Sequence, residues 1–398
     1  MTFLPSAESA RRIEAVRALM RAAEPPVDAL LLVQNVDVFY FSGSFQSGHL
    51  LLGAGGEPRL LVRKVFERAE EESPLDDVRP MTSLKDLPMH VREICGAPPW
   101  RIGMELDVLP ARAFENYRRL LGADAEIADA TDLVLDVRSV KSEWEIERIR
   151  DAAETVVPVF RYAPHFLKEA RSTAELQALL ECRARTSGHP GAVRMRGMNV
   201  ECSVGVVVSG PSGALPSHGF FPIGGRGFDP AVPVGADLQA IRRDTPIILD
   251  FLGFSGGYHA DQTRMAVKGR FSEEAGAVYA GMQEVLRQCE RTIAPGSIPS
   301  QVYREAVLLV EERGFTRGFM GPEGHAVGFI GHSVGLEVNE MPVVAPRFDR
   351  PLRAGTVLAL EPKFAHPDLG VIGIENTYVV RDGGLELLTP HSETVIVV

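Results

Sequence analysis

Hydrophobic residues recur at helical spacing near the start of the chain and in short runs after it. Residues 7–22 carry Ile13, Val16, Leu19 and Met20 three or four positions apart, which predicts an amphipathic helix. Short apolar runs predict buried strands at 29–33, 50–52, 60–62 and 102–106, and helical spacing returns at 111–121. This alternation predicts an α/β domain over residues 1–138.

Two segments of this half have other patterns. Residues 35–43 are unusually aromatic for a loop, so we expect them to pack in the core, with the lining of a pocket as the alternative. Residues 136–142 are polar and are interpreted as the linker to a second domain.

The second half of the chain combines helices with a longer series of strands. Ser172 and Glu175 have the spacing of a capping box, which predicts that a helix begins there. Further helices are predicted from Glu143 to about Val157, at 273–292 and at 300–313, and strands at 203–208, 246–254, 258–267, 356–362, 371–380 and 393–398. The pattern predicts an α+β domain over residues 139–398 with a largely antiparallel sheet.

Composition narrows the class of protein. A length of 398 residues favours two domains. A net charge of −11 argues against nucleic-acid and anionic-membrane partners. The four cysteines have no CxxC spacing, and the N-terminus has no cationic start followed by an apolar core. We therefore expect reduced thiols, no signal peptide and a cytoplasmic location.

Two acids lie in an otherwise apolar hairpin, at Asp250 and Asp261. Ser255-Gly256-Gly257 breaks the apolar pattern between them and is typical of a β-turn. A two-residue loop at Ser255-Gly256 places Asp250 directly opposite Asp261. Like charges on facing residues destabilise a strand pair, so a bound cation is the simplest reason for them.

A second hairpin repeats this arrangement with glutamates. Glu361 and Glu375 follow apolar strands, and His366-Pro367-Asp368-Leu369-Gly370 between them has turn residues. A three-residue loop at 367–369 places Glu361 opposite Glu375. A single acid in a strand is usually a solvated residue, but two facing pairs on apolar strands favour a metal site.

His332 completes a candidate ligand set. It lies between Gly331 and Gly335, and glycines allow close approach of backbone or substrate. One histidine and four carboxylates suit Mn²⁺, and Co²⁺, Fe²⁺ or Zn²⁺ less distinctly. Four negative charges exceed what one divalent ion needs, so we expect two ions that activate a water for hydrolysis.

The order of these candidate ligands along the chain, two aspartates, a histidine and two glutamates, resembles that of the pita-bread metallopeptidases. That family includes aminopeptidase P, prolidase and methionine aminopeptidase, with creatinase as a non-peptidase relative. The resemblance implies a pita-bread catalytic domain behind a creatinase-type N-terminal domain. It also implies hydrolysis of the peptide bond at the N-terminus of X-Pro peptides by a metal-bridging hydroxide. The matching motifs are Leu249-Asp250, Tyr258-x-x-Asp261-x-Thr263-Arg264, Gly331-His332-x-Val334-Gly335-Leu336-Glu337, Glu361-Pro362 and Gly373-Ile374-Glu375.

The resemblance also implies roles for individual residues. Asp250 would bind one ion with both oxygens, Asp261 and Glu375 would bridge the ions, and His332 and Glu361 would complete the other site. Glu361 would also shuttle a proton to the leaving nitrogen, and His218 would line the substrate site. Relatives with this N-terminal domain usually form homodimers, which we expect here.

Two positions depart from the family pattern. Asn339 stands where these peptidases carry a second histidine, and Gly373 stands where aminopeptidase P and prolidase relatives often carry an arginine. An amide can still donate a hydrogen bond to an oxyanion, so Asn339 joins His218 as a candidate catalytic and substrate-binding residue. The departures keep a second interpretation open, in which the protein is an amidohydrolase or lyase for a small metabolite. A catalytically silent binding module is disfavoured, because no ligand is lost.

Overall fold

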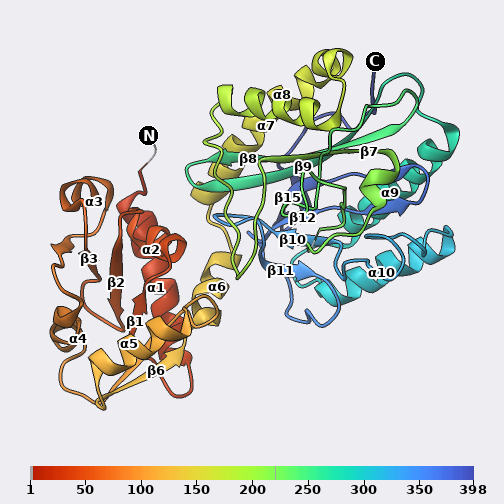
Figure 1. Ribbon diagram of the computed structural model, residues 1–398. Helices are drawn as coiled ribbons and strands as arrows, with labels where there is room; N and C mark the ends of the chain where they lie inside the picture. Colours follow the sequence, from red (N-terminus) through yellow and green to blue (C-terminus); the bar gives the residue numbers. More distant parts are fainter. Residues whose placement is uncertain (1–2, 220) are drawn as a thin grey trace. The chain divides into compact units, whose positions relative to one another are not determined.

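The computed structural model describes residues 3–219 and 221–398, which divide into two compact units (Figure 1). The first unit ends at Arg138 and the second runs from Ser139 to Val398. The elements of the first are α1 (Ser6–Ala22), β1 (Ala29–Leu32), α2 (Asn35–Ser42), β2 (Gly48–Gly53), β3 (Arg59–Val62), α3 (Phe66–Glu72), β4 (Asp77–Pro80), η1 (Leu84–Asp86), α4 (Leu87–Cys95), β5 (Trp100–Met104), α5 (Ala111–Leu121), β6 (Ala125–Asp129) and α6 (Thr131–Ser139).

The first unit is built on a mixed sheet of six strands in the order β4-β3-β2-β1-β5-β6. β2 pairs antiparallel with β1 and β3, whereas β1–β5, β5–β6 and β3–β4 are parallel. Leu31, Leu51, Leu61 and Ile102 from neighbouring strands form its buried core with residues of α4 and α5. The unit is α/β, as the alternation of strands and helices predicted.

Residues 35–42 form a helix, α2, and not a loop. The Gln34 side chain accepts a hydrogen bond from the Asp37 N–H at its start, and Gly43 ends it in the left-handed conformation with φ +72°. Tyr40 and Phe41 are fully buried, which confirms the expected core packing. Aromatic and β-branched residues are modest helix formers, and here their burial outweighs that preference.

The second unit is α+β, and its strands lie in three groups. The orders are β17-β9-β8-β7, β11-β10-β12-β15-β16 and the hairpin β13-β14, and every pair except β17–β9 is antiparallel. The predicted strand 371–380 is in fact two strands, because the chain leaves β14 before it enters β15. The elements are α7 (Glu143–Glu169), α8 (Thr173–Thr186), β7 (Gly205–Ser209), η2 (Gly210–Ala214), β8 (Pro246–Ser255), β9 (Tyr258–Val267), α9 (Glu273–Thr292), α10 (Pro299–Glu312), β10 (Gly331–Ser333), β11 (Glu340–Val344), β12 (Val357–Leu360), β13 (Lys363–His366), β14 (Gly370–Gly373), β15 (Asn376–Arg381), β16 (Gly384–Leu387) and β17 (Ile396–Val397).

Two boundaries near the start of this unit differ from the prediction. The predicted linker 136–142 is partly helical, because α6 continues to Ser139. Helix α7 does not end near Val157 but continues through Pro158 and Pro164 to Glu169. A proline inside a helix costs about 3 kcal/mol, yet the buried side chains beyond it, including Phe160 and Leu167, keep the helical segment packed on the sheet.

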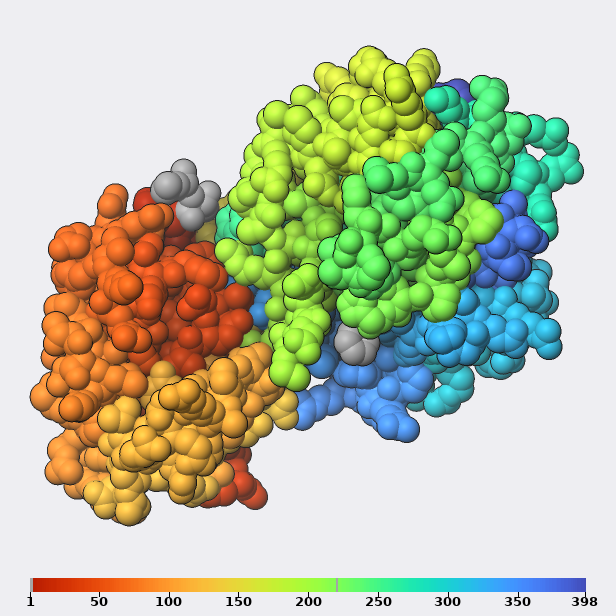
Figure 2. Space-filling model, viewed as in Figure 1, coloured from red at the N-terminus to blue at the C-terminus, as the bar shows by residue number. Residues whose placement is uncertain are grey.

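Side-chain alternation along β8 sends successive residues into two different cores. Leu249 and Phe251 pack with α7 and α8, whereas Ile248 packs in the core that contains α9 and α10. Asp250 has the parity of Ile248 and therefore points away from α7 and α8. In Figure 2 the chain between α8 and β8, coloured yellow-green to green, lies over the middle of the face of this unit that is turned to the viewer.

Candidate metal centre

The β8–β9 hairpin places its two aspartates on one face but not directly opposite each other. Asp250 pairs with Thr263, and Asp261 pairs with Leu252, so the two acids are diagonal neighbours. The predicted direct facing was wrong because the loop is Gly256-Gly257, with φ of +56° and +95°. A tight hairpin turn of this kind requires positive φ at both loop residues, which two glycines supply and a serine disfavours.

The β13–β14 hairpin has the predicted register, with His366 opposite Gly370 and Lys363 opposite Gly373. Glu361 and Glu375 lie two residues beyond this last pair, on the same face. Glu375 is joined to β9 by backbone hydrogen bonds with Thr263, and the Thr263 hydroxyl donates to Glu375 Oε2 at 2.9 Å. The two hairpins therefore bring their four acids together.

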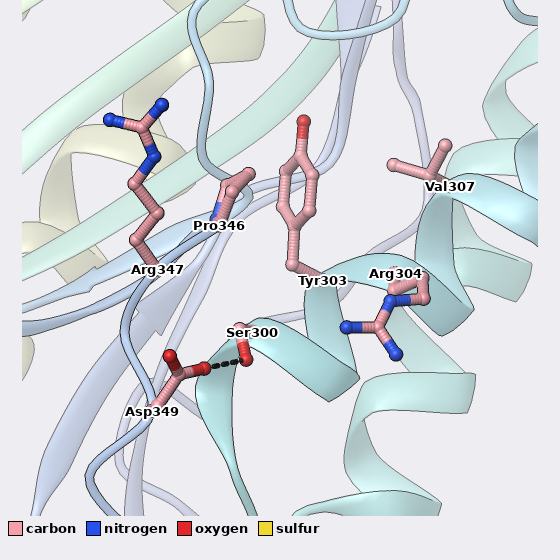
Figure 3. A pocket seen from close by; sticks show the side chains of 7 residues that line it. All are labelled: Ser300, Tyr303, Arg304, Val307, Pro346, Arg347 and Asp349. Carbon is pink, nitrogen blue, oxygen red and sulfur yellow. Dashed lines mark hydrogen bonds between the residues drawn. The ribbon is translucent and has the colours of Figure 1, made fainter.

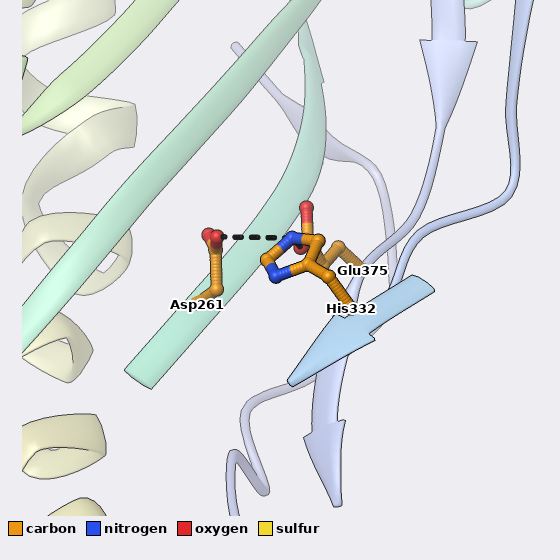
Figure 4. Close-up of side chains that lie close together, drawn as sticks. All are labelled: Asp261, His332 and Glu375. Carbon is orange, nitrogen blue, oxygen red and sulfur yellow. Dashed lines mark ion pairs between the residues drawn. The ribbon is translucent and has the colours of Figure 1, made fainter. Parts of the chain in front are cut away.

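His332 comes from β10, which lies beside β12 in the neighbouring sheet. Its Nε2 atom is 3.3 Å from Glu361 Oε1, 3.9 Å from Glu375 Oε1 and 4.0 Å from Asp261 Oδ2. One ligand atom from each of Asp261, His332 and Glu375 lies within 4.8 Å of the others (Figure 4). This spacing allows one ion to be bound by all three side chains.

Lys363 also points into the cluster and was not singled out from the sequence. Its Nζ atom is 2.5 Å from Glu361 Oε2, 2.6 Å from Glu375 Oε2 and 3.5 Å from Asp250 Oδ2. The side chain is almost fully buried. A signal was present in the sequence, because Lys363 is two residues after Glu361 and so shares its face of the strand.

Burial and neighbouring charges shift the pKa values of Asp261, Glu361 and Glu375. Burial and the charges of nearby carboxylates raise the pKa of Asp261 well above its usual range and that of Glu375 to about 7. Burial favours a higher pKa for Glu361 as well, but Lys363 and His332 outweigh it and lower the pKa to about 2. The pKa values of Asp261 and Glu375 are raised because their ionised forms are buried beside other carboxylates, and a bound cation would favour those ionised forms.

Two buried oxygens of the group Asp261, His332 and Glu375 fit a metal ion. Among the described residues, Asp261 Oδ1 and Glu375 Oε1 are buried without a hydrogen-bond partner. A buried carboxylate oxygen without a partner is costly, and a divalent cation would satisfy both atoms. Imidazole nitrogen and carboxylate oxygen are suitable donors for such an ion.

The remaining predicted residues lie in different surroundings. His218 is exposed, and its Nδ1 atom is 3.4 Å from the Ser217 hydroxyl. The Asn339 amide donates to the Arg196 carbonyl and accepts from the Arg196 N–H, at 2.8 Å each. Asn339 therefore holds the segment between α8 and β7 against the strand region that carries His332. Substrate contacts of His218 and Asn339 stay predictions.

A surface pocket of about 400 Å³ lies beside α10 (Figure 3). Its lining includes Tyr303, Arg304 and Arg347, and its carboxylate, Asp349, accepts a hydrogen bond from Ser300. Among the described residues, the lining of this pocket contains no histidine and only one acid, Asp349. The metal centre, which has both a histidine and grouped acids, is therefore the candidate active site.

Two models of known protein families match this chain. The family model of metallopeptidase family M24 matches residues 147–382, and that of the creatinase/prolidase N-terminal domain matches residues 12–140. The chain belongs to metallopeptidase family M24. The M24 match includes all five predicted ligands, and the family identifies the chain as a divalent-metal-dependent hydrolase.

Relatives and solved structures match nearly the whole chain. An Xaa-Pro dipeptidase of Pyrococcus horikoshii is 26% identical over 372 residues, which cover 93% of this chain and 95% of the relative. A probable dipeptidase, PepE, of Mycobacterium tuberculosis is 26% identical and covers 97% of this chain and 98% of the relative. The structure of an Xaa-Pro dipeptidase from Bacillus anthracis superposes with a TM-score of 0.81 at 23% identity, covering 98% of this chain and all of that one. An X-Pro aminopeptidase from Thermotoga maritima gives 0.78 at 24% identity, with 96% and 99% covered. These structures share the two-domain fold.

Proposed function

We propose that this M24 protein hydrolyses the peptide bond at the N-terminus of Xaa-Pro peptides, in the manner of an Xaa-Pro dipeptidase or aminopeptidase. The observation that carries the proposal is the buried cluster of Asp261, His332 and Glu375, in which two carboxylate oxygens have no hydrogen-bond partner. Relatives that match nearly the whole chain are named Xaa-Pro dipeptidases, which supports this substrate class.

The ion would be held by Asp261, His332 and Glu375, with Glu361 beside them. When bound, a divalent ion supplies Lewis-acid chemistry that lowers the pKa of a water molecule and polarises the scissile carbonyl. The five candidate ligands suit Mn²⁺ best. The sequence suggested two ions, because four acids carry more charge than one ion neutralises, and Lys363 changes that balance by adding a positive charge.

Glu361 is the residue that we propose to move the proton. The water oxygen adds to the carbonyl carbon, Glu361 takes the proton from that water, and the proton passes to the leaving nitrogen as the C–N bond breaks. Lys363 and His332 hold the pKa of Glu361 at about 2. Glu361 is therefore ionised in the cluster, which is the form that accepts a proton from the water.

The second candidate is a hydrolase or lyase for a small metabolite, which Asn339 and Gly373 suggested. The structure gives Asn339 a bonding role toward Arg196, which explains its presence without a change of substrate class. We also propose a cytoplasmic homodimer. Its four cysteines are unpaired, and the dimer rests on the family resemblance. In the described part of the chain, none of the helices has both the length and the apolar character of a membrane span.

The substrate class is tested with a peptide panel. Metal-stripped protein resupplied with Mn²⁺ is assayed on dipeptides and tripeptides with and without proline at the second position. We expect metal-restored cleavage confined to the Xaa-Pro members, and the ratio of dipeptide to tripeptide turnover separates dipeptidase from aminopeptidase. No cleavage of the panel by protein with bound metal would contradict the proposal and favour a small-metabolite substrate.

A further inference from the structure

The metal centre has a side that faces Lys363 and a side that faces His332, and the carboxylates have different partners on the two sides. Glu361 and Glu375 each direct one oxygen to His332 and the other to Lys363. On the Lys363 side, the ammonium lies within 3.5 Å of an oxygen from each of Asp250, Glu361 and Glu375. On the His332 side, Glu375 Oε1 lies 3.9 Å from His332 Nε2 and Asp261 Oδ2 lies 4.0 Å from it. Glu375 Oε1 and the other Asp261 oxygen, Oδ1, are buried and have no hydrogen-bond partner among the described residues.

We propose that Lys363 takes the place of a second metal ion, so that the centre binds a single divalent cation on the His332 side. An ammonium is a compact positive charge with three donors and no lone pair. It can therefore neutralise and hydrogen-bond carboxylates, but it cannot coordinate a metal. This inference rests on the metal-dependent function proposed above and changes its expected stoichiometry.

The local fold keeps the Lys363 side chain in this position. Lys363 faces Gly373 across the hairpin, and a Cβ atom at 373 would lie 2.6 Å from Lys363 Cγ. The side chain thus occupies space that any other residue at 373 would fill. Entry of an ion on this side would require the buried ammonium to leave three carboxylate oxygens, and separating a buried charge from its partners is strongly unfavourable.

The test is metal stoichiometry, measured by elemental analysis and calorimetric titration of the full chain with Mn²⁺. We expect about one ion per chain for the wild type and about two for Lys363→Met, because the neutral side chain frees the carboxylates of Asp250, Glu361 and Glu375. Lys141→Met is the matched control. Lys141 is the other buried lysine in this part of the chain that pairs with a glutamate, Glu340, and its loss should leave the content at about one.

A second variant tests the assignment of sides without altering Lys363. Asp250→Asn should retain the ion, because Asp250 faces the ammonium, whereas Asp261→Asn should lose it. The electron paramagnetic resonance spectrum of the Mn²⁺-loaded wild type should show an isolated ion and no spin-coupled pair. This spectrum tests whether one or two ions are bound even if Lys363→Met fails to fold.

Two tightly bound ions in the wild type, an unchanged content in Lys363→Met, or loss of the ion in Asp250→Asn would each overturn the single-ion proposal. These measurements need no substrate. A protein that binds one ion and cleaves no peptide would thus refute the proposed function and leave the single-ion centre standing.

Discussion

Lys363 and Gly373 face each other across the β13–β14 hairpin, and the bare α-carbon of Gly373 leaves the room that the lysine side chain occupies. The pair links two positions ten residues apart in sequence through one strand register. It brings an ammonium to the centre of a cluster of acids, and it accounts for a glycine at the position where the family pattern often has an arginine.

Substitution of this glycine should therefore destabilise the hairpin. In Gly373→Ala, the added carbon would meet Lys363 Cγ at 2.6 Å and the Pro362 carbonyl oxygen at 2.7 Å. We expect a loss of about 1–3 kcal/mol in the free energy of unfolding, measured in urea. Gly276→Ala, in helix α9 with nothing within 4 Å, is the control and should gain up to about 1 kcal/mol. Equal stability of Gly373→Ala and the wild type would show that the space is not needed.

Loss of a ligand on the His332 side should weaken metal binding without unfolding the chain. In His332→Ala and Asp261→Asn, one of the three side chains that approach the site no longer binds the ion. We expect the Kd for Mn²⁺ to rise at least roughly tenfold, which corresponds to about 1.4 kcal/mol. Asp368→Asn changes an exposed acid in the turn of the second hairpin and should leave the Kd unchanged. Wild-type affinity in His332→Ala would place the ion elsewhere.

The Asn339 side chain should act by holding the segment between α8 and β7. Asn339→Ala leaves the N–H and the carbonyl of Arg196 without their amide partner, at an expected cost of about 1–3 kcal/mol. Asn339→Asp retains the acceptor and loses the donor, so its effect should be intermediate. Hydrogen exchange of the amides in residues 190–203 should quicken in the same order. Unchanged exchange in Asn339→Ala would contradict a positioning role.

Acid should destabilise the first unit through His49. Its Nε2 atom is 2.7 Å from the Tyr117 hydroxyl, and burial, followed by the charge of Arg63, lowers its pKa to about 4. The unfolded chain titrates near pH 6.5, so between pH 6.5 and 4 it binds a proton that the folded chain does not, and stability falls as the pH drops.

Replacing His49 should reduce this pH dependence. In His49→Gln, the loss of unfolding free energy between pH 7 and pH 4 should be smaller than in the wild type by an amount on the order of 3 kcal/mol. His165→Gln, at an exposed histidine of α7, is the control. An identical pH profile for His49→Gln and the wild type would contradict the account.

The sequence predicted which acids share a face of each hairpin, because strand parity tolerates a register error of two residues. Choosing Ser255-Gly256 as the turn shifted the β8–β9 register, but Asp250 and Asp261 stayed on the same face. Glu361 and Glu375 were placed by a correct register. The same register gives the position of Lys363, but a lysine has no lone pair to bind a metal when charged, so the ligand pattern did not predict it.

Other features depend on packing that the sequence pattern does not show. Helix α7 continues through Pro158 because its later turns are buried against the sheet. The role of Asn339 depends on Arg196, 143 positions away in the chain. Neither the hydrogen-bonded pairing of such distant residues nor the burial that carries a helix past a proline is visible in local periodicity.

The most direct test of the central claim is the hydrolysis of an Xaa-Pro dipeptide by three preparations side by side. These are metal-free wild type, the same protein resupplied with Mn²⁺, and His332→Ala resupplied with Mn²⁺. We predict turnover in the second preparation alone, with all three folded by circular dichroism. Turnover by the metal-free protein, or wild-type rates in His332→Ala, would contradict a hydrolase that works through the cluster of Asp261, His332 and Glu375.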